Sequence, residues 1–498
     1  MSPFTSYPLT KLDAAGISES KSSEQGYYDY IVVGGGTAGC VLASCLSEDP
    51  GVKVLLLERG NARRGWTTRV PLLSTNFLGD EDAAYTWSFT PLTNLTNNPR
   101  LTMVTGMGLW RWFVNHSMAY RRGYPQDYDL WSACGRKGWS YKEIEGYFKK
   151  SKRFAGTPER NHHGAHGERI VRDTGDLYFP SAHGCVDACT SLGLPYSLHM
   201  NAPETSMNVC GKLDFTIDLS SHRNSTFHAF LPQKVASERK SQLHLCTRAA
   251  WSELPSGGED KKTYHARALR EVILCAGAIG NPQILLLSGI GPRHKVKQPL
   301  KKALAGVGES LQDHMSTGII YSVPMDESLH VIQRSPRELS LNYSVTLPLV
   351  KVFSCHVIPT KLAHVPELPD IKIQPIHWNI SEPPIHLEEG ALFLMVVLLR
   401  PASRGTVSLA SEDPLECPAC DLGYFTDPAD YDVMCKRIKF TKRIGEKMRE
   451  HGMRMKDMYM PVSELDAHPD AFDGLHLSLM DCINSMAEGH PDDEHVNT

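Results

Sequence analysis

Long hydrophobic runs are absent from the sequence. The longest apolar stretch, Ala391–Leu399, is far shorter than the roughly 20 residues that a helix needs to cross a bilayer. The first 26 residues are polar and rich in serine, and they lack the basic start and the apolar segment of a secretory signal. We therefore expect a cytoplasmic protein without a membrane partner.

The sequence also has little excess of charge of either sign. Its 52 Lys and Arg residues nearly balance 56 Asp and Glu residues, which leaves a formal net charge of -4. So small an excess gives no reason to expect nucleic acid or an anionic membrane as a partner. With 498 residues, the chain is long enough for two or more domains.

The cysteines and histidines form no convincing metal motif. The 13 cysteines are an odd number spread along the chain, so most are expected to be free thiols. Cys417 and Cys420 have a suggestive spacing, but a zinc site would need a second such pair. His162, His163 and His166 lie in a glycine-rich stretch, which we interpret as a surface loop. We expect no metal.

One glycine-rich turn carries the strongest functional signal. It lies between an apolar, β-rich run at 28–33 and an apolar segment at 40–46, and a second apolar strand is expected at 52–57. The turn, Gly34–Gly39, matches the pattern G-x-G-x-x-G, which brings a helix N-terminus close to a pyrophosphate. Glu58 ends the second strand, where a carboxylate accepts hydrogen bonds from an adenosine ribose. This unit predicts FAD or NAD rather than NADP.

Other elements are predicted from local patterns. Ser140 and Glu143 form a capping box that opens a helix over 139–152. A strand at 272–276 leads through a glycine-bearing turn to a helix, and residues 431–450 read as an amphipathic helix. Alternating runs between about 315 and 410 predict an antiparallel sheet, whereas 61–126 reads mostly as loop.

Five stretches, in the same order, make the chain resemble the glucose–methanol–choline (GMC) oxidoreductases. They are Tyr28–Cys40 with Leu57–Gly60; Arg122–Gly123, Asp127–Asp129 and Gly138–Tyr141; Leu274–Gln283 with Leu287–Pro292; Val307–His314; and Arg404–Val407. The resemblance implies a mixed α/β fold in which a Rossmann-like FAD-binding domain carries an antiparallel-sheet substrate domain. It identifies the cofactor as FAD.

The resemblance also implies a domain plan and a set of cofactor contacts. A flexible leader spans 1–27, the FAD-binding domain 28–165 and 220–315, the substrate domain 166–219 and 316–470, and a polar tail 471–498. The residues expected to bind FAD are Gly34, Gly36, Thr37, Ala38, Gly39, Glu58, Arg59, Trp87, Asn115, His116, Ser117 and Met118.

The sequence departs from the family pattern in two places. Trp110 and Arg111 stand where the family usually has a glycine pair beside the flavin, so the loop geometry there differs. No segment with the family's catalytic histidine is recognisable near the C-terminus. His490 precedes a proline, but the residues that follow are acidic rather than small, so we do not assign it as the base. We expect a chain that lacks this segment, and we assign no catalytic residue.

The resemblance implies oxidation of the CH–OH group of a small-molecule alcohol, with transfer of a hydride to FAD. Related enzymes occur in fungal secondary-metabolite pathways. The absence of a visible secretion signal suits an intracellular biosynthetic enzyme of that kind. Two alternatives remain open: a truncated, catalytically impaired member of the family, and a non-redox cyclase or lyase on the same fold. A pure NAD dehydrogenase would not need the downstream motifs.

Overall fold

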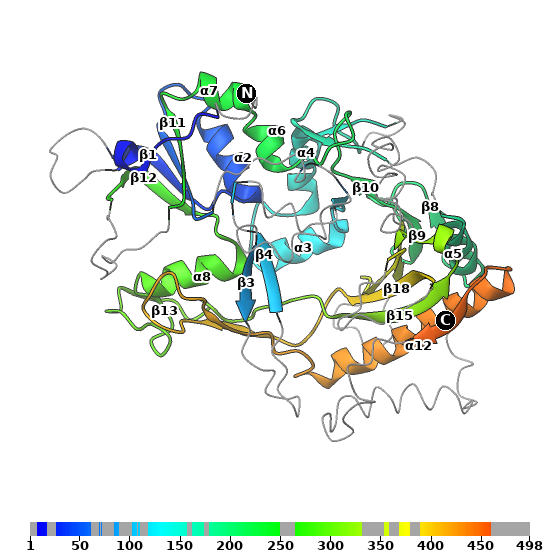
Figure 1. Cartoon of the computed structure of the whole chain (residues 1–498). Coiled ribbons are helices and arrows are strands. Elements are labelled where there is room, and N and C mark those ends of the chain that lie inside the picture. Colours follow the sequence, from blue (N-terminus) through cyan, green and yellow to red (C-terminus); the bar gives the residue numbers. More distant parts are fainter. Residues whose placement is uncertain are drawn as a thin grey trace.

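Two β-sheets organise the part of the chain that the computed structural model describes (Figure 1). The described residues are 7–16, 26–60, 69, 71, 84–88, 102–106, 108–109, 118–156, 162–173, 179–249, 264–330, 353–357, 368–378 and 389–459. A smaller, parallel sheet holds the glycine-rich turn, and a larger, mainly antiparallel sheet lies beside it. The predicted fold class, a mixed α/β fold with these two kinds of sheet, is confirmed.

The parallel sheet has the strand order β11-β2-β1-β12, and each neighbouring pair in it is parallel. Most side chains of β1 and β2 that face the core are fully buried, as parallel strands covered on both faces require. The predicted strand–turn–helix–strand unit is therefore present. Its elements are β1 (Tyr27–Val33), α2 (Thr37–Leu46) and β2 (Val54–Glu58). The other two strands of the sheet are β11 (Leu243–Thr247) and β12 (Arg267–Leu274), and helix α8 (Gly277–Leu287) follows β12.

The larger sheet has the order β21-β15-β18-β17-β16-β9-β8. All of its neighbouring pairs are antiparallel except β8 and β9, which confirms the antiparallel sheet predicted between 315 and 410. Its strands are β8 (Tyr196–Ser197), β9 (Val209–Lys212), β15 (Ser316–Val323), β16 (Phe353–Val357), β17 (Ile371–Ile376), β18 (Gly390–Leu398) and β21 (Lys456–Tyr459).

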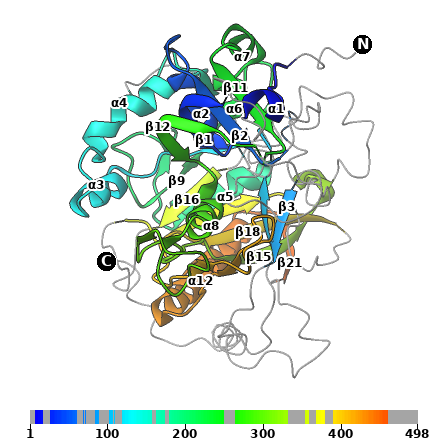
Figure 2. The ribbon, with the colours of Figure 1, turned by 90° about the vertical axis from the view of Figure 1, so that its left-hand side faces the viewer.

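Two helices cover one face of the larger sheet (Figures 1 and 2). Helix α12 (Pro428–Glu450) runs along β15 and β18, and α5 (Pro180–Ser191) packs against α12 and β9. Side chains on alternate positions of β17, Ile371 and Ile373, join the buried cluster under these helices. The Asp427 side chain caps α12 by accepting a hydrogen bond from the Ala429 N–H at 2.9 Å. The helix predicted at 431–450 is thus confirmed and begins three residues earlier.

The helix predicted from the Ser140 capping box is also present. Helix α4 (Tyr141–Ser151) follows α3 (Pro125–Ala133), and the Glu143 carboxylate accepts hydrogen bonds from both the N–H and the hydroxyl of Ser140. A short parallel pair, β6 (Lys152–Phe154) and β7 (Arg169–Val171), follows.

Two segments differ from the sequence-based expectation. The region 61–126, read mostly as loop, contains an antiparallel hairpin of β3 (Ala84–Ser88) and β4 (Thr102–Gly106). Of the expected flexible leader, residues 7–16 pack on the parallel sheet, where the Thr10 N–H donates to the Leu245 carbonyl at 2.9 Å, and Tyr27 already belongs to β1. Long-range contacts of this kind leave no periodic signal in a polar segment.

The remaining elements are short. They are α1 (Leu12–Ala15), β5 (Ala119–Tyr120), β10 (Asp214–Phe215), α6 (Thr226–Phe230), α7 (Gln233–Glu238), β13 (Ile290–Gly291), β14 (Lys302–Ala303), the 3₁₀ turn η4 (Met325–Glu327), β19 (Thr406–Ser408) and β20 (Ala419–Asp421).

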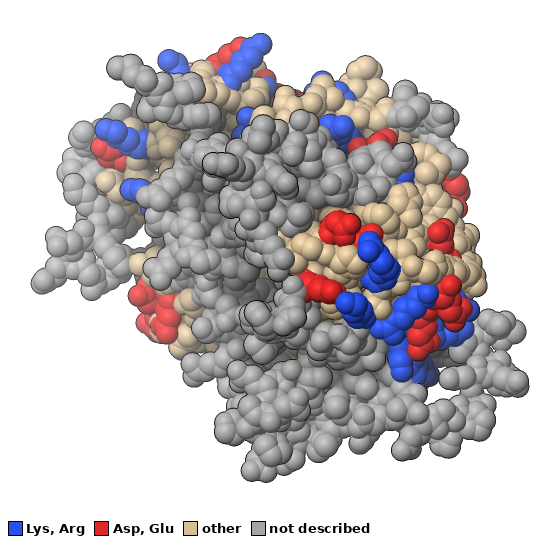
Figure 3. All heavy atoms as spheres, turned by 45° about the vertical axis from the view of Figure 1, so that its right-hand side comes forward, with Lys and Arg blue, Asp and Glu red and all other residues tan. Residues whose placement is uncertain are grey.

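Charges of both signs are mixed on one face of the described part of the molecule (Figure 3). Basic and acidic side chains lie next to one another there. Within the described ranges, no helix is both long enough and apolar enough to cross a membrane.

Candidate cofactor site

The turn between β1 and α2 is shaped by glycines that admit no side chain. Gly34 has φ +108°, and a Cβ atom there would lie 2.5 Å from the carbonyl oxygen of Cys275, which directly follows the neighbouring strand β12. A Cβ atom at Gly39 would overlap the Gly34 carbonyl oxygen, so α2 sits directly on the turn. These contacts explain why the first and last glycines of the motif are needed by the protein itself.

The middle glycine has a different role. Gly36 is the N-cap of α2, and no atom lies within 4 Å of a Cβ built there. Thr37 and Ala38, in the first turn of the helix, are exposed. No side chain among the described residues caps this helix N-terminus, so its first N–H groups remain available to a ligand. This open, positively polarised end is the arrangement that binds a pyrophosphate.

Glu58 lies beneath the turn and joins three backbone segments. Its Oε2 accepts the Gly35 N–H at 2.8 Å, while Oε1 accepts the N–H groups of Gly60 at 2.7 Å and Gly108 at 3.0 Å. An ionised carboxylate has about four lone-pair positions, so these bonds leave capacity for a further hydroxyl donor. The residue is buried, with 8% of its surface exposed.

Besides Glu58, an apolar cluster packs around the turn. Leu109, next to Gly108, is buried and packs in the cluster that contains Val32 and Cys40. Burial, together with the nearby Glu58 carboxylate, raises the pKa of the Cys40 thiol, so the thiol stays protonated.

The other residues expected to contact FAD lie in varied positions. Arg59 follows Glu58, and its Nη2 donates to the Leu415 carbonyl at 3.0 Å, so it points towards the segment before β20. Met118 is buried against Leu213, Phe215 and Ile217, with φ +63°. Trp87 lies on β3, opposite Met103. Its side chain, together with Asn115, His116 and Ser117, lies outside the described residues, as does the altered pair Trp110 and Arg111.

Comparison with known proteins identifies the family. The model of the N-terminal domain of GMC oxidoreductases matches residues 28–316, which is more than half of the chain. The protein belongs to the GMC oxidoreductase family. A model of the family's C-terminal domain matches residues 401–485.

Proteins with similar sequences include oxygen-dependent choline dehydrogenases. That of Pseudomonas savastanoi pv. phaseolicola is 29% identical over 446 residues, covering 84% of this chain and 77% of the relative. That of Yersinia pseudotuberculosis serotype IB is 30% identical over 447 residues, covering 84% and 76%.

Solved structures share the fold. Pyridoxine 4-oxidase from Mesorbium loti has a TM-score of 0.73 and 22% identity, over 91% of this chain and 85% of that one. A formate oxidase from Aspergillus oryzae has a TM-score of 0.76 and 20% identity, over 92% and 87%. The chain is therefore a GMC-type, FAD-dependent oxidoreductase that acts on alcohols, and the predicted cofactor, FAD, is confirmed. The open N-terminus of α2 and the free capacity of Glu58 fit the pyrophosphate and ribose of that cofactor.

The comparison corrects one expectation. We expected the chain to lack the family's C-terminal segment, yet the C-terminal family model matches residues 401–485. Inspection looked for one short motif, whereas a family model sums weak agreement over many positions. Residues 460–498, including His490, lie outside the described part of the chain.

A second group of titratable side chains lies away from the glycine-rich turn. Burial, followed by the nearby cations, lowers the pKa of His162 to about 4 and that of His163 to about 2. Burial also lowers the pKa of Lys152 to about 7, and its Nζ lies 2.8 Å from His163 Nδ1. The sequence placed His162 and His163 in a surface loop and did not connect them with Lys152.

Proposed function

We propose that the N-terminus of α2 binds the pyrophosphate of FAD and that Glu58 binds its ribose. The single observation that carries this proposal is the open space around Gly36. The other two glycines of the motif, in contrast, are tightly packed against the backbone. Exposed N–H groups in the first turn of α2 stabilise the negative charge of phosphate groups. The remaining acceptor capacity of Glu58 suits a ribose hydroxyl.

We further propose that the enzyme oxidises a small-molecule alcohol to the corresponding carbonyl compound. FAD supplies the hydride acceptor when it is bound. Removal of the hydroxyl proton makes departure of the hydride from the carbinol carbon easier, and a positioned base performs that step. The Rossmann-like unit keeps the cofactor in place, while the antiparallel sheet beside it offers the surface against which an alcohol would be oriented.

The test is anaerobic mixing of the flavin-loaded protein with a panel of alcohols. Choline, pyridoxine and aromatic alcohols are sensible members, because relatives and structural neighbours are named for reactions on such compounds. Bleaching of the oxidised flavin bands and a product lighter by two hydrogens support oxidation. A product of unchanged mass, with the flavin still oxidised, would instead favour the cyclase or lyase alternative. Oxygen consumption then separates an oxidase from a dehydrogenase.

The biological setting is a separate proposal. Enzymes of this family take part in fungal secondary-metabolite pathways, and a late alcohol oxidation in such a pathway suits this chain. Deletion of the gene is then expected to cause accumulation of an alcohol that the purified enzyme oxidises. Unchanged metabolite levels in the deletion strain would contradict this setting without affecting the proposed reaction.

A further inference from the structure

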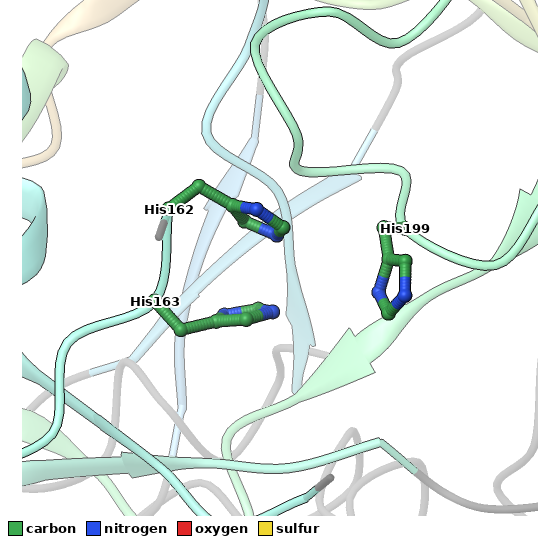
Figure 4. Close-up of side chains that lie close together, drawn as sticks. All are labelled: His162, His163 and His199. Atoms are coloured by element: carbon green, nitrogen blue, oxygen red, sulfur yellow. The ribbon is translucent and has the colours of Figure 1, made fainter. Parts of the chain in front are cut away.

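Three histidines from two separate segments come together beside β6. His162 and His163 precede β7, and His199 lies in the loop that follows β8. One ring nitrogen from each lies within 4.8 Å of the other two. Figure 4 shows the rings of His162 and His163 extending towards the ring of His199. His166, which the sequence places with the first two, is exposed and is not part of the group.

Two of these rings have a nitrogen with nothing to bind. The Nε2 atoms of His162 and His163 are buried, and neither has a hydrogen-bond partner among the described residues. His162 as a whole is only 5% exposed. Buried polar atoms in native proteins are nearly always paired, and an unpaired one often marks an ion or a water. His163 and His199 are partly exposed, so an ion can reach the group from solvent.

The rings are held in place before any ion binds. His163 stacks on Phe154, with ring centroids 3.7 Å apart and an interplanar angle of 13°. Arg122 fixes both histidine segments: its Nη2 donates to the His162 carbonyl at 2.6 Å, and its backbone N–H donates to Asn201 Oδ1 at 2.9 Å. Asn201 lies two residues after His199, so one arginine anchors both sides of the group.

We propose that His162, His163 and His199 form a binding site for a divalent transition-metal ion such as Zn²⁺. Neutral imidazole nitrogens suit Zn²⁺, Cu²⁺ and Ni²⁺, and three of them leave a fourth position for water. Zn–N bonds of about 2.0–2.1 Å require ligand nitrogens roughly 3.4 Å apart, so the rings need to close by at most about 1.4 Å. The ion would clamp the segment before β7 to the loop after β8.

Lys152 gives the site a distinctive electrostatic signature. Its Nζ lies 2.8 Å from the Nδ1 of His163. A charged Lys152 repels an incoming cation, and by donating to Nδ1 it also leaves the ring proton on Nε2, the nitrogen that would bind the metal. Lys152 is 1% exposed, so water screens this repulsion poorly. Replacing it by methionine is therefore expected to tighten metal binding, an effect that a purely structural role for the lysine would not produce.

The experiment uses the full-length, flavin-loaded protein after treatment with a chelator. Zn²⁺ binding is measured by calorimetry, and Co²⁺ is used as a probe whose visible absorption reports nitrogen coordination. We expect one Zn²⁺ ion to bind per chain. In His199→Asn its affinity should fall by at least about 100-fold, which is more than the usual cost of losing an outer-sphere partner. His166→Asn is the matched control and should bind within about twofold of the wild type. The unchanged flavin spectrum of each variant shows that it is folded.

Three outcomes would overturn the proposal. They are no saturable Zn²⁺ binding below about 1 mM, equal loss of affinity in the His166 and His199 variants, and no tightening in Lys152→Met. Inorganic phosphate is titrated in parallel, because Lys152 and Arg122 could instead serve an anion. Binding of phosphate alone, abolished in Lys152→Met, would assign the group to an anion and refute the metal site. Since flavin content and alcohol oxidation are read separately, failure of this proposal leaves the proposed function untouched.

Discussion

Gly39 packs against the carbonyl oxygen of Gly34 so closely that a Cβ atom at Gly39 would overlap it. A Cβ atom at Gly36, three residues earlier in the chain, would meet nothing within 4 Å. The same motif thus contains a glycine that the fold needs and a glycine that the ligand needs. The two roles can be separated by experiment.

The first prediction concerns this pair of glycines. Gly36→Ala should leave the apo protein as stable as the wild type, because its backbone φ of −77° suits alanine and the added methyl group meets no atom. FAD affinity should fall by about tenfold or more, because the methyl group occupies space close to the pyrophosphate. Gly39→Ala should destabilise the apo protein itself. Thermal unfolding of apo protein and FAD titration measure the two effects, and equal losses of stability in both variants would contradict the assignment.

Replacement of Glu58 by glutamine should damage both stability and cofactor binding. The carboxylate accepts three backbone N–H groups, whereas an amide has one acceptor oxygen, so at least one buried donor loses its partner. Each unpaired donor costs about 1–3 kcal/mol, which urea unfolding of the apo protein detects. Glu238→Gln is the control, since that side chain is 62% exposed. A Glu58→Gln protein with wild-type stability would argue against the hydrogen-bond set described.

Acid sensitivity is predicted at the N-terminus of α5. His377 Nε2 lies 3.0 Å from Ser181 Oγ, which donates to Glu327 Oε2 at 2.7 Å. Burial lowers the pKa of His377 to about 3, whereas the unfolded chain titrates near 6.5. Between these values the unfolded state binds more protons, so stability falls as the pH decreases, by up to ~1.4 kcal/mol per pH unit from this one group.

His377→Gln should therefore make the decrease in stability between pH 6.5 and pH 4 less steep. His162 and His163, whose pKa values are also lowered, act in the same direction, so the slope is reduced rather than removed. Urea unfolding at several pH values gives the slope, with the exposed His294→Gln as control. An identical slope in the two variants would show that His377 is not the buried neutral group described.

The contact between α12 and the larger sheet leaves no room at Gly445. A Cβ atom there would overlap the hydroxyl oxygen of Tyr321 on β15. Gly445→Ala should cost roughly 1–3 kcal/mol through overpacking, and adding Tyr321→Phe should restore part of it. Gly146→Ala on α4, where no atom lies within 4 Å, should instead be neutral or stabilising by up to about 1 kcal/mol. Chemical denaturation of the single and double variants measures these effects, and the absence of any rescue would contradict the contact.

Local sequence was sufficient for the elements whose determinants lie within a few residues. The glycine spacing from Gly34 to Gly39 specifies the turn because the first and last glycines each answer a backbone requirement of the turn itself. The capping box of Ser140 and Glu143 specifies where α4 begins, because both partners belong to the same helical turn. The family resemblance then identified FAD, because five motifs in order are hard to produce by chance.

Tertiary structure alone decided what lies far apart in the sequence. In the folded chain the third histidine beside His162 and His163 is His199, not the nearby His166. Glu327 likewise lies at the start of α5, far from it in the sequence. Tertiary structure also packed residues 7–16 on the parallel sheet, where a polar leader had been expected. Contacts of this kind depend on how sheets and helices are stacked, and no local periodicity or cap records them. The glycine-rich turn is therefore readable from the sequence, whereas the histidine group became visible only once the chain was folded.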